Sequence, residues 1–171
     1  MRVSHLVDGE ISATGGFALR IDLSVADIPA GVAVNTPVTF SAAPLPRFRT
    51  NALIKQCLVH LTVPFQDTAD AAFNTDTISV GLVTGGVAAL VAAFEANING
   101  TEVIDTIPGV ATPAVPVKNL TDNNQLTITI NSMAAKTLSS LKLGKLYILI
   151  QYQDPSDQSA TKAVPFGGGY V

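Results

Sequence analysis

The sequence predicts an all-β protein: an antiparallel β-sandwich of jelly-roll type, with one short helix and extended terminal arms. Three observations support this fold class. At least four stretches alternate apolar and polar side chains with a period of two, which places neighbouring side chains on opposite faces of a strand. Turns rich in proline and glycine separate these stretches. Only residues 87–97 space their apolar side chains as a helix does.

The longest predicted strand covers residues 53–63, and we expect it in the middle of a sandwich sheet. Its odd positions are apolar apart from Lys55, so we expect them to face the core. The even positions are then expected to face outward, and they include two apolar side chains, Ile54 and Leu58. The expected inward side chains of this strand are Leu53, Cys57, Val59, Leu61 and Val63.

The 171 residues are long enough for one well-cored domain, which we place at residues 17–153. Residues 1–16 form a predicted N-terminal arm and residues 154–171 a predicted C-terminal tail, because both lack core-forming periodicity. Residues 1–16 and, within the tail, residues 165–171 are expected to act as attachment segments. Further strands are predicted at residues 17–23, 32–40, 77–82, 101–107, 125–130 and 145–153.

Three local features refine this interpretation. Pro37 lacks a backbone donor, so the strand that contains it belongs at a sheet edge or across a bulge. Ile128 and Ile148 lie at the centres of two apolar stripes and are predicted core residues. In residues 87–97, five alanines and the spacing of Leu90, Val91 and Phe94 predict the single short helix.

The composition bears on the partners of the protein. Charged residues make up only 13% of the chain, against about 25% in an average globular domain. Such a surface is expected to be covered in part by copies of the same chain or by a larger assembly. The net charge of −3 argues against a nucleic-acid partner. We also expect no membrane segment and no secretion signal, since no apolar run approaches about 18 residues.

The chain is predicted not to be an enzyme, and no catalytic residue, cofactor or metal site is assigned. Cys57 and His60 differ by three positions in a strand and therefore point to opposite faces. The sequence contains no Gly-x-Ser-x-Gly or His-Glu-x-x-His motif. Asp67, Asp70 and Asp76 fall in one polar loop, but their spacing does not match a calcium loop, so a solvated loop is favoured over a cation site.

Four segments together resemble the β-sandwich structural proteins of tailed-bacteriophage particles, such as head-decoration and head-fibre proteins. They are residues 58–67 (LVHLTVPFQD), 76–81 (DTISVG), 122–129 (DNNQLTIT) and 144–152 (GKLYILIQY). The resemblance covers roughly residues 47–153 and is one of pattern, not of a signature motif. It implies a non-enzymatic virion component, such as a capsid decoration, cement or minor capsid protein, bound in several copies to capsid or other virion proteins. A phage tail or fibre protein and a carbohydrate-binding sandwich module are the alternatives.

Six apolar or aromatic residues are candidates for an interface. On the final predicted strand Tyr147 and Leu149 face away from the core, as Ile54 and Leu58 do on the long strand. If these two strands are neighbours, the four side chains form one outer patch. Either the helix at 87–97 or another subunit would cover it, the latter in a closed homo-oligomer such as a trimer. Phe166 and Tyr170 of the tail complete the candidate set.

Overall fold

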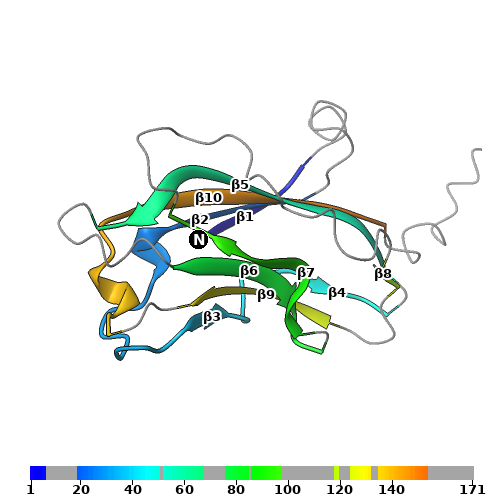
Figure 1. The fold of residues 1–171 in the computed structure, drawn as a ribbon. Coiled ribbons are helices and arrows are strands. Elements are labelled where there is room, and N and C mark those ends of the chain that lie inside the picture. The colour runs from blue at the N-terminus through cyan, green and yellow to red at the C-terminus, as the bar shows by residue number, and fades with distance from the viewer. Residues whose placement is uncertain are drawn as a thin grey trace, which may run out of the picture.

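Two antiparallel β-sheets face each other in this protein, so the predicted all-β sandwich is confirmed (Figure 1). The computed structural model describes residues 1–6, 19–50, 52–67, 76–84, 86–97, 118–119, 124–131 and 135–153. Within these residues the only helical elements are two short 3-10 turns, Val25–Asp27 and Leu138–Ser140. The jelly-roll connectivity stays a prediction.

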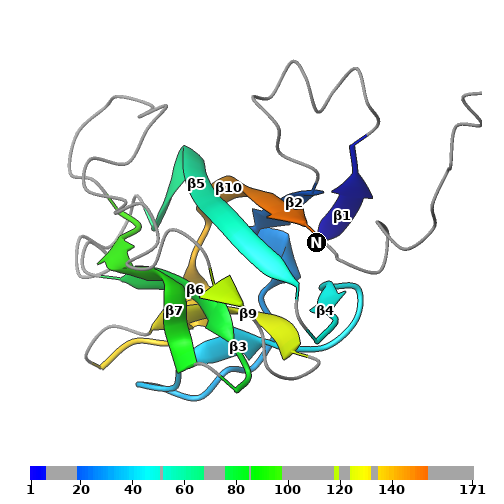
Figure 2. The same ribbon diagram turned by 90° about the vertical axis from the view of Figure 1, so that its right-hand side faces the viewer.

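Sheet one has the strand order β1-β2-β10-β5-β8. Its strands are β1 (Arg2–His5), β2 (Leu19–Ser24), β10 (Leu143–Gln153), β5 (Leu53–Gln66) and β8 (Lys118–Asn119). Sheet two has the order β3-β9-β6-β7, and β4 also pairs with β9. Its strands are β3 (Val38–Phe40), β9 (Asn124–Asn131), β6 (Thr77–Leu82), β7 (Gly86–Glu95) and β4 (Arg47–Phe48). Turned by 90°, the molecule shows β5, β10 and β2 above β6, β9 and β3 (Figure 2).

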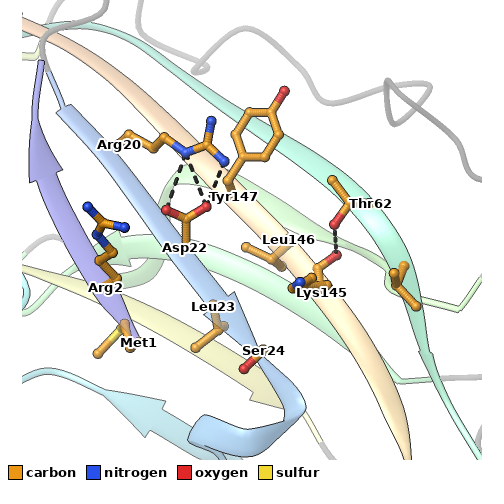
Figure 3. A pocket seen from close by; sticks show the side chains of 11 residues that line it. Met1, Arg2, Arg20, Asp22, Leu23, Ser24, Thr62, Lys145, Leu146 and Tyr147 are labelled. Carbon is orange, nitrogen blue, oxygen red and sulfur yellow. Dashed lines mark hydrogen bonds and ion pairs between the residues drawn. The ribbon is translucent and has the colours of Figure 1, made fainter.

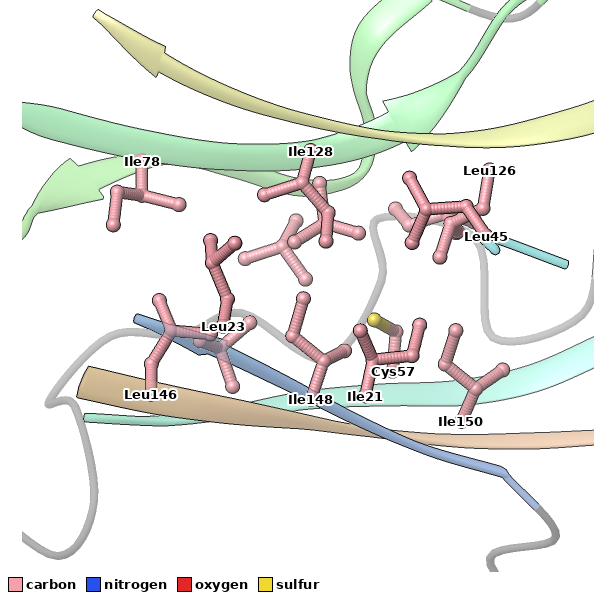
Figure 4. Packing of buried hydrophobic residues seen from close by; sticks show 14 of the residues in the cluster. Ile21, Leu23, Leu45, Cys57, Ile78, Leu126, Ile128, Leu146, Ile148 and Ile150 are labelled. Carbon is pink, nitrogen blue, oxygen red and sulfur yellow. The ribbon is translucent and has the colours of Figure 1, made fainter. Parts of the chain in front are cut away.

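The core lies between the sheets and is built from the predicted alternating positions. Ile128 on β9 and Ile148 on β10 are both 0% exposed, which confirms their predicted burial. Figure 4 shows side chains of sheet two, such as Ile78 and Ile128, pointing toward Ile148 and Ile21 of sheet one. Because β2 and β10 of sheet one each bury one face in this way, a register slip of one residue would expose the whole stripe.

The predicted helix at 87–97 is wrong, because this segment forms strand β7. It pairs antiparallel with β6, where Thr77 lies opposite Glu95 and Ile78 opposite Phe94. Helix propensity favours alanine by less than about 1 kcal/mol per residue, which strand pairing and burial readily exceed. Two register shifts along this ladder accompany the burial of both Leu90 and Val91, which a regular strand would place on opposite faces.

Strand β5 also departs from the prediction, because its alternation is interrupted. Gln56 lies opposite Gln151 while Ile54 lies opposite Tyr152, so Lys55 is an extra residue in a β-bulge. The bulge reverses the alternation, which makes Ile54 a core residue at 1% exposure and leaves Leu53 half-buried. The inward positions of Cys57, Val59 and Leu61 are confirmed.

Residues 2–5 of the predicted N-terminal arm belong to the sandwich, and residues 7–16 of that arm lie outside the described residues. Strand β1 pairs with β2 from Arg2 opposite Asp22 to His5 opposite Leu19, and forms one edge of sheet one. Of the predicted strand at 32–40 only β3 is formed, and it lies at the sheet edge that Pro37 predicted. The predicted strand at 101–107 and the tail 154–171 lie outside the described residues.

Gly144 should be the least replaceable glycine among those described, because it has a positive φ of 156° and lies against a buried ring. A β-carbon there would lie 2.6 Å from Cγ and 2.8 Å from Cε1 of Phe65, which is 0% exposed and has no room to move. We expect Gly144→Ala to lower the free energy of unfolding by about 1–3 kcal/mol through overpacking, measured by urea titration.

The control for this prediction is Gly31→Ala. Gly31 also has a positive φ, 74°, but a β-carbon there would meet no atom within 4 Å. Its replacement therefore reports the backbone cost alone, on the order of 1 kcal/mol. Equal losses in the two variants would contradict the packing of Phe65 against Gly144.

Candidate interaction surface

The outer face of sheet one gathers side chains from four strands into rows. In one row Arg2, Asp22, Tyr147 and His60 lie opposite one another across β1, β2, β10 and β5. The next row consists of Ser4, Arg20, Leu149 and Leu58. We call the four side chains on β5 and β10, namely Leu58, His60, Tyr147 and Leu149, the outer stripe.

Tyr147 is held between two neighbours that come from the strands on either side of it. The His60 ring from β5 stacks on the Tyr147 ring, with centroids 4.5 Å apart and planes 12° from parallel. From β2, the Arg20 guanidinium lies over the same ring, 4.3 Å from its centroid. A guanidinium over a ring is attracted by the π electrons and by the ring's polarisable surface. These two contacts hold the tyrosine in one orientation on the sheet.

Arg20 is fixed in turn by Asp22, two positions along the same strand. Its Nη2 donates to Oδ1 of Asp22 at 2.8 Å, and its Nε lies 3.1 and 3.2 Å from the two carboxylate oxygens. The hydrogen bond to Asp22 is the main cause that raises the pKa of Arg20 above its usual value. Both side chains remain exposed, at 43% and 40%, so the pair contributes little to stability. Its effect is to orient the guanidinium over Tyr147.

A groove of about 610 Å³ opens beside the stripe, where β1, β2, β10 and β5 run next to one another (Figure 3). Three cations line it, one on each of three strands: Arg2, Arg20 and Lys145. In the part of the chain that the structure describes, Asp22 is the one carboxylate that lines it. An adjoining hollow shares these four residues and extends along β1 to Ser4 and Leu6, so the two form one continuous depression.

The structure brings together three of the six predicted interface residues. Leu149 lies directly opposite Leu58, and Tyr147 lies opposite His60. Ile54 does not belong to this surface, because the bulge at Lys55 turns it into the core. The cover predicted from a helix at 87–97 is also wrong, because that segment is a strand of sheet two. Phe166 and Tyr170 lie outside the described residues.

Sequence reasoning missed Arg20, Asp22 and Arg2 as members of the surface. Their outward orientation was readable from the alternation of residues 17–23 for the first two. Their position beside Tyr147 could not be predicted, because it depends on the pairing of β2 with β10. These strands are more than a hundred residues apart in sequence.

Cys57 and His60, which the sequence places on opposite faces of a strand, are separated in the structure as well. Cys57 is 0% exposed and burial raises the pKa of its thiol to about 12, so it stays protonated at neutral pH. It faces the core, whereas His60 lies on the outer face beside Tyr147. No group of three or more His, Cys, Asp or Glu side chains in the described ranges is placed to hold a metal ion. Nor does any helix in those ranges have the length and apolarity to span a membrane.

One member of the predicted acidic loop has an unusual environment. Asp76 is 0% exposed, at the corner where β6 begins and β7 ends, and its backbone carbonyl accepts from the Ala96 amide at 2.9 Å. In the described part of the chain, neither of its carboxylate oxygens has a hydrogen-bond partner from another residue. Burial is the main cause that raises its pKa to about 7, and Glu95 adds to the effect. Asp70, the loop's central acid, lies outside the described residues.

Asp76 should make the protein less stable as the pH rises. Its folded pKa of about 7 exceeds the ordinary value of 3.8, so between these values the folded state holds a proton that the unfolded state has lost. The contribution of this proton to the free energy of unfolding is complete below pH 3.8 and is lost as the pH rises to about 7. Between these values the free energy of unfolding falls by up to about 1.4 kcal/mol per pH unit. Urea unfolding at pH 5, 6, 7 and 8 measures it, and Asp76→Asn should abolish this slope.

The exposed carboxylate of Asp22 offers a matched control. Asp22→Asn should shift the unfolding curves by less than about 1 kcal/mol and leave the pH slope in place, because this side chain is exposed. A wild-type protein with no loss of stability between pH 5 and 7, or an Asp76→Asn variant that keeps the slope, would contradict the assignment.

Comparison of this chain with protein-family models, with curated proteins and with solved structures finds no match.

Proposed function

We propose that this protein is a non-enzymatic structural component of a bacteriophage particle, a capsid decoration, cement or minor capsid protein that is bound in several copies. The observation that carries the proposal is the outer stripe, in which apolar and aromatic side chains adjoin on two neighbouring strands. A large exposed apolar patch is typical of a contact with another protein, and the outer stripe supplies the apolar and aromatic side chains for one. The low charged fraction, 13%, supports the same conclusion for the chain as a whole.

The rigidity of the stripe suits repeated contacts in a particle. Tyr147 is held between Arg20 and His60, so it loses little conformational freedom when a partner covers it. Leu58 and Leu149 lie side by side on paired strands and together form one apolar contact surface. Burial of each such leucine is worth about 1.5–3 kcal/mol at most, because both are already half-buried. A closed homo-oligomer, such as a trimer, would cover the stripe without forming fibres.

The carbohydrate-binding alternative is less well supported by the geometry. Sugar sites of β-sandwich modules need an aromatic ring with an accessible face, and the chain has no tryptophan. Tyr147 is the aromatic residue that lines the groove, and its ring is contacted by His60 from one neighbouring strand and by Arg20 from the other. A tail or fibre location is compatible with the same stripe and is distinguished by where the copies lie in the particle.

Quantitative mass spectrometry of purified particles, combined with a density map, tests the proposal. We expect the protein at a copy number that is a fixed ratio of the major capsid protein, with sheet one facing neighbouring density. Its absence from purified particles would overturn the proposal. Specific binding of the isolated protein on a glycan array, together with that absence, would favour the carbohydrate-binding alternative.

A further inference from the structure

We propose that the groove between β1, β2 and β10 binds an extended, carboxylate-rich segment of a partner protein. The inference rests on the proposed function, because it names the chemistry by which another virion protein would be recognised. Two independent observations support it: the charge of the groove against that of the chain, and the pairing pattern within the groove.

The groove is cationic in a protein that is acidic overall. Among the described residues it is lined by Arg2, Arg20 and Lys145 against the carboxylate of Asp22, while the whole chain has a net charge of −3. The groove therefore differs in sign from the chain as a whole. This charge favours a negatively charged partner at the groove.

The pairing pattern shows which cations are available to a partner. Asp22 is engaged by three hydrogen-bond contacts with Arg20, which itself lies over Tyr147. Arg2 lies opposite Asp22 in the strand register, yet among the described residues its guanidinium has no ion pair. The same holds for the ammonium of Lys145 in the described part of the chain. Both side chains are exposed, so two cations border the groove without a carboxylate of their own.

The spacing of these two cations fits an extended peptide. Arg2 and Lys145 lie on strands separated by β2, and their rows are two residues apart in register. Strand spacings of about 4.8 Å and a rise of about 3.3 Å per residue place their α-carbons roughly 12 Å apart. In an extended segment, acidic residues two or four positions apart lie about 7 or 13 Å from each other on one side. Alternate carboxylates would reach both cations.

The surroundings favour a peptide over a phosphate polymer. Val63 and Tyr147 line the groove beside the cations, so the apolar side chains of a partner segment also find a contact. Nucleic-acid binding draws on many phosphate contacts and a basic domain, whereas this groove has two available cations and the chain is acidic. The occupant we commit to is therefore an extended segment in which acidic and apolar residues alternate.

Fluorescence anisotropy with two synthetic peptides tests this inference. One labelled octapeptide alternates glutamate and valine, and its control alternates glutamine and valine. We expect the intact protein to bind the glutamate peptide at least about tenfold more tightly at low salt, a difference of about 1.4 kcal/mol, and to lose this preference as salt increases. The double variant Arg2→Ser with Lys145→Ser should bind both peptides equally weakly.

The matched control is the double variant Arg47→Ser with Lys142→Ser. It removes the same two charges from exposed positions that do not line the groove, and it should keep the preference for the glutamate peptide. Unchanged melting temperatures would show that both double variants fold. Equal binding of the two peptides by wild type, or equal loss in the two double variants, would overturn the proposal. So would displacement of the glutamate peptide by inorganic phosphate or a single-stranded oligonucleotide at the same concentration.

The outcome is separable from that of the proposed function. The peptide assay needs no particles, so its failure removes the groove inference alone. Absence of the protein from purified particles removes the virion role, and a specific peptide preference would then identify a partner segment in another assembly.

Discussion

Replacement of Ile148 by alanine is expected to lower the free energy of unfolding by about 2–5 kcal/mol. Ile148 lies at the centre of β10, the middle strand of sheet one, and is 0% exposed. It lies opposite Ile21 on one neighbouring strand and Val59 on the other, so truncation leaves a cavity that three strands border. The interior is close-packed, and the surrounding side chains relax into such a cavity only in part. Equilibrium denaturant unfolding measures the loss.

The adjacent residue supplies the control. Leu149 points to the other face of the same strand and is half-buried, so Leu149→Ala should cost no more than about 1 kcal/mol, the range of a cross-strand pair. Ile128→Ala on sheet two should resemble Ile148→Ala, because Ile128 is also 0% exposed. A loss below about 0.5 kcal/mol for Ile148→Ala would refute the assigned face.

The second large effect is expected at the outer stripe, where Leu149→Glu should convert a self-associated protein into folded monomers. The substitution places a carboxylate beside Leu58, in a surface that we propose is covered by another copy of the chain. Burial of an unpaired charge in such a contact costs several kcal/mol, enough to reduce the association constant by about a thousandfold or more. Light scattering with a concentration series measures the mass, and circular dichroism reports the fold.

Leu143→Glu is the matched control for that variant. Leu143 is on the same strand, is 40% exposed, and lies outside the outer stripe, so a charge there should leave the association state unchanged. If wild type is a monomer at high concentration, self-association through the stripe is excluded. If Leu149→Glu unfolds the protein instead, the stripe is part of the monomer's own packing.

Much of the fold was predictable because strand alternation is local. The stripes through Ile21, Ile78, Ile128 and Ile148 each repeat every second residue, and each proved to be buried. The predicted strand at 77–82 agrees with β6, and those at 125–130 and 145–153 differ from β9 and β10 by one or two residues at their ends. Here the side-chain pattern and the final packing require the same conformation, so no longer-range information was needed.

Two errors have a common physical origin. Residues 87–97 have the composition of a helix, yet pairing with β6 satisfies their backbone and buries Leu90 and Val91. Ile54 has the parity of an outward residue, yet a bulge at Lys55 turns it into the core. In both cases the neighbouring strands decided the conformation. The side-chain pattern of one segment contains no information about the strand with which it pairs.

By itself the sequence determined that this is an all-β protein and that Leu58, Tyr147 and Leu149 face outward, because period-two alternation specifies a strand and its two faces. It also specified the low charge of the chain. Only the tertiary structure decided that these residues meet and that Arg20, Asp22 and His60 surround Tyr147. Strand order and register arise from contacts between residues that can be more than a hundred positions apart. The alternation within a single strand does not specify which strand lies beside it.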